Sequence, residues 1–151
     1  MVSAMPLALV AALSLPCTVP ALAAQAAVAV PKVASTSLLR TTTTWDGVKI
    51  VYPKTERPEI QSVMVEIAPG AATAWHRHPV NNIAYIIEGK VRLELENGTT
   101  HEFKAGEAFA EVVDTWHRGV NTGEGPLRIL VVYVGEAGTP LSVPKAGKQG
   151  E

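Results

Sequence analysis

From Trp45 onward, the chain alternates between short apolar runs and clusters of turn residues, which is typical of an all-β domain. In the clearest run, Val91, Leu93 and Leu95 alternate with charged side chains, as in a strand that buries one face. An Asn-Gly pair follows this run and is a strong signal for a hairpin turn. By the same signs we expect strands, and no helix, after the N-terminal region, at residues 48–52, 62–68, 83–87, 91–95, 99–103, 108–113 and 127–134.

The N-terminal segment differs from the rest because residues 1–24 contain no charged side chain. Its apolar run, 5–15, has about the length of the hydrophobic region of a secretory signal peptide. Two prolines interrupt the segment, and it is too short to read as a membrane-spanning helix. Ala21 and Ala23 supply small residues where signal peptidase reads them, although no Lys or Arg precedes the apolar run. We therefore expect a signal peptide and a periplasmic or secreted protein; the alternative is a buried N-terminal helix.

The length of 151 residues favours a single domain. We place a linker and a peripheral strand at 25–44, a β-barrel at 45–135 and a loose tail rich in Pro, Gly and Lys at 136–151. The single cysteine, Cys17, lies in the predicted signal peptide, so we expect no disulfide, thiolate ligand or cysteine nucleophile in the mature protein. The formal net charge of −1 provides no basic excess for nucleic acid or, after signal cleavage, for a membrane surface.

Three of the four histidines lie in two short segments, Trp75-His76-Arg77-His78 and a second segment that begins at His117. On a β-strand, residues i and i+2 point to the same face, so the first two imidazoles would lie together. Neutral imidazole is a common ligand for zinc, iron, copper and nickel. These residues are therefore candidate ligands of a transition metal.

The spacing of these residues resembles the two sequence motifs of the cupin family, which forms a small antiparallel jelly-roll β-barrel. In the first motif five residues separate a Gly from a His-x-His pair, and a Glu and a further Gly follow. In the second, a later His is followed four positions on by Asn. The matching residues are Gly70, His76, His78 and Gly89 in the first motif and Gly98, Gly106, His117 and Asn121 in the second. The resemblance covers about residues 60–135 and implies a cupin barrel with a metal held by three histidines.

Two positions depart from this pattern. Lys104 stands where the second motif usually has Pro, which affects only a turn. Asn82 stands where cupins commonly have a Glu ligand, and a neutral amide oxygen is a weaker donor to a dication. We expect three neutral imidazoles with the remaining positions open to water or substrate, an arrangement that suits catalysis better than a purely structural role. The alternatives are a weak fourth ligand at Asn82 and a barrel without metal.

The resemblance implies metal-dependent chemistry of the oxygenase, isomerase or lyase type on a small polar molecule. Imidazole ligands favour Fe or Zn, with Mn, Ni and Cu also possible. The alternative function is a non-catalytic cupin that binds a small ligand or metal without turnover. No pair of nucleophile and base is visible in the sequence, and the candidates for a general base are Glu66, Glu111, Tyr85 and Tyr133.

Several side chains near the motifs have competing roles. Trp75 and Trp116 each precede a motif histidine, so alternation should direct them away from the ligands. Glu111 lies in an apolar run and either orients a ligating histidine or lies at the rim. Glu66 is either a surface carboxylate or an acid in the pocket, and Arg128 invites an ion pair with a glutamate across the strands.

The run at 83–87 is apolar on both faces. Asn82, Ala84 and Ile86 share the parity of the histidine pair, whereas Ile83 and Ile87 face the other way. We expect the outer face to be covered by the N-terminal strand or by a second protomer, as in a homodimer. The remaining histidine, His101, follows the hairpin turn and is expected to be solvated.

We expect cleavage after Ala23 or within the next few alanines, because small residues lie there in the order that signal peptidase reads. N-terminal sequencing of the protein recovered from the periplasm or the medium measures this directly. An intact Met1 on the exported protein would contradict the prediction.

Overall fold

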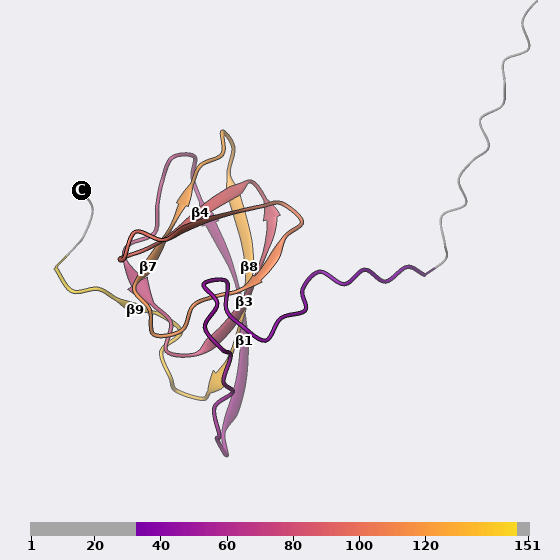
Figure 1. Ribbon diagram of the computed structural model, residues 1–151, viewed down its shortest axis with the longest axis vertical. Helices are drawn as coiled ribbons and strands as arrows, with labels where there is room; N and C mark the ends of the chain where they lie inside the picture. The colour runs from indigo at the N-terminus through magenta and orange to yellow at the C-terminus, as the bar shows by residue number, and fades with distance from the viewer. Residues whose placement is uncertain (1–32, 148–151) are drawn as a thin grey trace, which may run out of the picture. The chain divides into compact units, whose positions relative to one another are not determined.

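The computed structural model describes residues 33–147, and within this range the chain forms two antiparallel β-sheets without a helix (Figure 1). No helix of this part of the chain is long and apolar enough to cross a membrane. The predicted signal peptide lies outside the described residues. The strands are β1 (Pro58–Ile67), β2 (His76–Arg77), β3 (Asn81–Glu88), β4 (Lys90–Leu95), β5 (Thr100–Lys104), β6 (Ala108–Ala110), β7 (His117–Asn121), β8 (Leu127–Glu136) and β9 (Val143–Pro144).

The strand order confirms the all-β, jelly-roll type of fold. One sheet has the order β1-β8-β3-β6 and the other β5-β4-β7-β2-β9, so that most neighbours, apart from the β4–β5 hairpin, are not consecutive in the sequence. The hydrophobic core lies between the sheets, where Ile86 of β3, Val91 of β4 and Leu127 of β8 are fully buried. Burying a side chain of this kind contributes about 1.5–3 kcal/mol. The two sheets therefore hold each other together through a shared apolar interior.

Most of the predicted strands correspond to observed ones with ends shifted by a few residues. The strands β1, β3, β4, β5, β6 and β8 correspond, in this order, to the predicted runs at 62–68, 83–87, 91–95, 99–103, 108–113 and 127–134. In β4 the alternation is borne out, because Val91, Leu93 and Leu95 are buried and the residues between them are half-buried. The short strands β2 and β9 have only two residues each and were not predicted as strands, and β7 alternates in burial although its sequence, His-Arg-Gly-Val-Asn, has no apolar alternation.

The predicted strand at 48–52 is wrong. The segment follows a turn in which Thr44 donates its backbone N–H to Val48 O at 2.8 Å, and its only bridge pairs Thr43 with Lys49. Val51 is 72% exposed. The segment joins neither sheet, because its backbone hydrogen bonds close a local turn with residues 42–44. The peripheral strand expected before residue 45 likewise does not form among the described residues 33–44.

The C-terminal segment is not the loose tail that we predicted, at least as far as Lys145. Val143 pairs with Arg77 and Pro144 with His76, so β9 forms the edge of the sheet beside β2. The backbone N–H of Lys145 donates to Trp75 O at 2.8 Å. The Pro- and Gly-rich composition does not predict this strand, because a two-residue strand is stabilised by pairing with its neighbour and not by its own hydrophobic pattern.

The structure explains why the motif position 89, at the turn between β3 and β4, is a glycine. Its φ is +85°, and an added Cβ would lie 2.7 Å from Pro126 O and 2.9 Å from Leu127 Cα. Both of these atoms belong to the backbone, so they cannot rotate away. Gly98 has a similar φ of +87° at the β4–β5 hairpin, but an added Cβ there would meet nothing within 4 Å.

We predict that Gly89→Ala destabilises the protein more than Gly98→Ala. Both substitutions impose about 1–2 kcal/mol of strain for a left-handed backbone, and only Gly89→Ala adds an overlap costing about 1–3 kcal/mol. Urea denaturation of the two variants measures the difference in the free energy of unfolding. Equal losses would show that the β8 backbone moves aside freely.

Candidate metal centre

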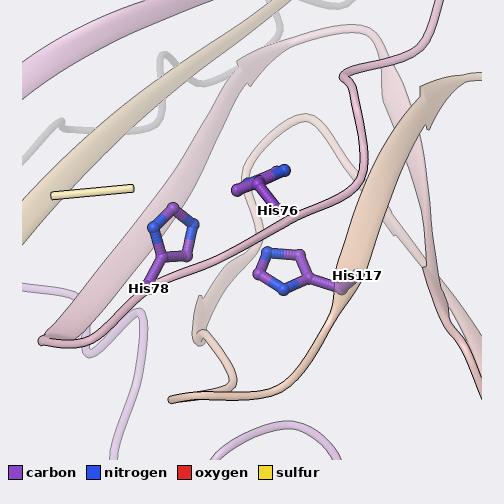
Figure 2. Close-up of side chains that lie close together, drawn as sticks. All are labelled: His76, His78 and His117. Atoms are coloured by element: carbon purple, nitrogen blue, oxygen red, sulfur yellow. The ribbon is translucent and has the colours of Figure 1, made fainter. Parts of the chain in front are cut away.

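The backbone pairing of β2 with β7 brings the three candidate ligands together. His76 lies directly opposite His117 in this ladder, and His78 follows two residues later. The ring centroids are 4.4 Å apart for His76 and His117, 4.8 Å for His76 and His78, and 5.0 Å for His78 and His117. One ring nitrogen from each residue lies within 4.8 Å of the others. Figure 2 shows the three rings gathered around one space.

Hydrogen bonds to the backbone fix the orientation of each ring. The Nδ1 of His76 bonds to Ala74 O at 2.8 Å, that of His78 to Leu141 O at 2.7 Å and that of His117 to Thr115 O at 2.8 Å. A carbonyl oxygen can only accept, so Nδ1 carries the proton in every case. In the neutral ring this leaves the lone pair on Nε2, which is the tautomer that a metal ligand requires.

Burial keeps these imidazoles uncharged. His78 is 5% exposed and His117 is 1% exposed, while His76 is half-buried. Burial lowers the pKa of His78 to about 4, and it also lowers the pKa of His117. The pKa of His76 is lowered by burial and by the nearby His117. Three neutral nitrogen donors at one point fit a divalent transition metal better than Mg²⁺ or Ca²⁺, which prefer oxygen.

A polar row crosses the opposite sheet beside the histidines. Asn82 of β3 pairs with Tyr133 of β8 on one side. On its other side, its backbone O accepts a hydrogen bond at 3.1 Å from the N–H of Glu111, the residue that follows β6. Because Ile83 pairs with Ala110, Asn82 and Glu111 occupy opposite positions in the same register. Residues directly opposite each other in a ladder point to the same face. All three side chains of the row line the cavity that contains the histidines.

Asn82 shares this cavity but is not held as a ligand would be. It is 3% exposed, and its Nδ2 has no hydrogen-bond acceptor among residues 33–147. Its parity with His76, His78 and Ala84 was predicted correctly, since all four line the same cavity. The Asn82 side chain therefore lines the cavity and has an amide nitrogen that makes no hydrogen bond within the described residues.

Glu111 fulfils neither of the roles that we predicted for it. It does not orient a histidine, because the three Nδ1 atoms bond to carbonyl oxygens, and at 7% exposure it does not lie at a rim. Its Oε1 accepts hydrogen bonds from Trp45 Nε1 at 2.7 Å and from the Val112 N–H at 3.0 Å. Burial raises the pKa of Glu111. The partner Trp45 comes from a distant segment, which sequence reasoning could not connect to this carboxyl group.

The cavity has a volume of about 100 Å³. Tyr133 forms part of its wall, with its ring centroid 5.4 Å from that of His78. Burial, together with the charge of Glu111, raises the pKa of Tyr133 to about 12. Tyr133 is therefore a hydroxyl donor at neutral pH and not a ready base. Of the four candidate bases, Glu111 and Tyr133 reach the cavity, whereas Glu66 and Tyr85 do not line it.

The remaining candidates have structural roles. Glu66 pairs with Arg128 across β1 and β8, where Arg128 Nε donates to Glu66 Oε1 at 3.0 Å, as the surface interpretation expected. The Trp75 ring packs under the Arg118 guanidinium, and Trp116 packs under Arg77. Neither tryptophan lines the cavity, as the alternation predicted. His101 is exposed on β5, beside Phe103 and apart from the other histidines.

The motif residue Asn121 stabilises the barrel and does not contact the metal centre. It is 1% exposed, and its Nδ2 donates to Ile67 O and to Gly125 O, both at 2.9 Å. Its Oδ1 accepts the Gly123 N–H at 2.9 Å. The side chain thus joins the end of β1 to the turn between β7 and β8, and this turn leads into the strand that carries Tyr133.

Known proteins resemble the chain in the same region. The family model for the cupin domain matches residues 63–133. No curated protein sequence matches the chain. Among solved structures, a mutant of Bacillus subtilis oxalate decarboxylase is 27% identical, with a TM-score of 0.50, covering 56% of this chain and 23% of that one. The polyketide cyclase RemF from Streptomyces resistomycificus is 26% identical, with a TM-score of 0.50, covering 60% of this chain and 63% of that one.

The chain spans about a quarter of the length of the oxalate decarboxylase chains that it resembles. A conserved protein with a double-stranded β-helix domain from Klebsiella pneumoniae is 23% identical, with a TM-score of 0.49, covering 62% of this chain and 84% of that one. Residues 63–133, which the family model matches, contain β2, β3, β4 and β7 and all three clustered histidines. The chain therefore contains a cupin domain at residues 63–133.

Proposed function

We propose that this protein is a metal-dependent cupin enzyme that acts on a small molecule in the cavity between its sheets. The observation that carries the proposal is the set of three imidazoles whose Nδ1 atoms are bound to backbone carbonyls. Their Nε2 atoms are left with lone pairs in one buried space. His76, His78 and His117 would hold a divalent transition metal, with Fe or Zn favoured over Mn, Ni and Cu.

The residues around this site favour chemistry over a structural metal role. Asn82 supplies no carboxylate at the position where many cupins have one, so the donor set consists of three neutral nitrogens. A bound metal would keep positions open for substrate or water and would supply Lewis acidity or activation of dioxygen. The wall around the histidines is largely apolar, and Tyr133 and Glu111 line it as possible hydrogen-bonding partners of a substrate.

The second candidate is a cupin that binds a small ligand or metal without turnover. The replacement of the usual glutamate by Asn82 favours it, because a site without a carboxylate holds a dication less firmly. Oxalate decarboxylase and the polyketide cyclase are both named for reactions, which supports the enzyme as the first candidate.

We predict that His78→Ala abolishes stoichiometric metal binding, whereas His101→Ala leaves it intact. Loss of one of three ligands should weaken metal binding by more than the roughly 10–100-fold that is typical for the partners of a ligand. Elemental analysis and metal titration measure the binding, and the melting temperature with and without metal measures the linked stabilisation. Unchanged metal content in His78→Ala would refute the metal site.

We predict turnover by the metal-loaded protein, and its loss in His117→Ala. Catechols, uronates and keto acids serve as candidate substrates, with oxygen consumption and product formation as the readouts. The His101→Ala variant again serves as the control, because that residue lies apart from the cavity. Saturable binding of a compound with no product would favour the non-catalytic cupin instead.

A further inference from the structure

The cavity beside the three imidazoles contains no cationic side chain. Its lining includes no lysine or arginine, and the single carboxyl group in it belongs to Glu111. Most of the wall is apolar, formed by side chains such as Ile67, Val91, Leu93, Phe109 and Ile129. A charged group removed from water is costly unless a charge or several hydrogen bonds compensate it. A ligand with two carboxylates would find neither a guanidinium nor an ammonium group here, and only a bound metal could compensate its charge.

The carboxyl group of this cavity belongs to Glu111, which lies opposite the position where the cupin motif usually has its glutamate. Asn82 occupies the position of the usual glutamate, and Glu111 lies directly opposite it on the adjacent segment, joined by the 3.1 Å backbone hydrogen bond. Glu111 is absent from the cluster of groups close enough to share a metal ion. The cavity thus retains one carboxyl group, but as a wall group that is available to a ligand.

The hydrogen-bonding capacity of this wall is only partly used. Trp45 and the Val112 N–H hold Oε1 of Glu111, while Oε2 makes no hydrogen bond within residues 33–147. Beside it, the buried Nδ2 of Asn82 lacks an acceptor in the same range. An unsatisfied buried polar group costs about 1–3 kcal/mol. A carboxyl oxygen can accept in either protonation state, so the wall offers an acceptor next to a donor.

We propose that the cavity binds a small, uncharged hydroxyl compound with an apolar body, and that Glu111 and Asn82 select it. A hydroxyl group of the ligand donates to Glu111, and a neighbouring oxygen accepts from Asn82. The volume of about 100 Å³ is well below the roughly 300–1,000 Å³ of pockets for drug-sized ligands, which limits the compound to about the size of a single ring. This inference rests on the proposed function, because an oxygen of the same ligand faces the metal.

The test is calorimetric titration of the Co²⁺-loaded protein with three probes: catechol, the similarly shaped 1,2-difluorobenzene, which has no hydroxyl group, and oxalate. We expect catechol to bind more tightly than either of the others. Glu111→Gln should weaken catechol binding about ten- to a hundredfold, the range for a hydrogen bond to a charged group. The matched control, Glu66→Gln, removes a surface carboxylate of β1 and should change nothing.

Metal content is measured separately for each protein, which keeps this inference distinct from the metal site. A protein that binds Co²⁺ but prefers oxalate, or that binds catechol and difluorobenzene equally, overturns the substrate class and leaves the metal centre standing. A protein that binds no Co²⁺ overturns the proposed function itself. If Glu111→Gln fails to fold, the comparison of catechol with 1,2-difluorobenzene on the metal-free unmodified protein decides the question, because no metal chelates the hydroxyl groups there and equal binding would overturn the role of Glu111 and Asn82.

Discussion

The backbone ladder that sets His76 opposite His117 is the constraint on which the site depends. It brings two imidazoles together by strand pairing alone, and the two-residue spacing adds His78. Because β2 is only two residues long, its position is secured from outside, by β7 on one side and β9 on the other. The C-terminal segment, whose composition resembles a tail, thus supports the strand that carries a candidate ligand.

The same segment also orients a ring directly. Leu141 O accepts the Nδ1 proton of His78, and Leu141 packs against the core. Backbone carbonyls take this role for all three histidines, in place of the carboxylates that orient ligating histidines in many metal sites. Because the carbonyl groups accept these hydrogen bonds, Glu111 does not hydrogen-bond to a histidine Nδ1. The carboxyl group is held instead by Trp45, so a residue that precedes β1 positions a group inside the barrel.

The outer face of the four-stranded sheet remains apolar. Ile83 is 43% exposed and Ile87 is 40% exposed, and β1 presents Ile60 and Met64 at an edge of the same sheet. Residues 39–52 approach Ile83 and enclose with it a second cavity of about 240 Å³, of which Asn82 and Glu111 also form part of the wall. Part of the cover that we predicted for this face is thus supplied by the N-terminal segment. The predicted homodimer would cover the remainder and stays a prediction.

The sequence by itself determined the fold class, most of the strands and the three clustered histidines. These features depend on local alternation, turn residues and fixed spacing, all of which are written along the chain. It could not place residues 48–52 or the strand β9, because a short segment pairs only where the folded chain brings it alongside the edge of a strand. The sequence predicted the loss of a carboxylate at Asn82, but the tertiary structure decided that Glu111 lies opposite it. Register between strands is a long-range property, and only the folded sheet fixes it.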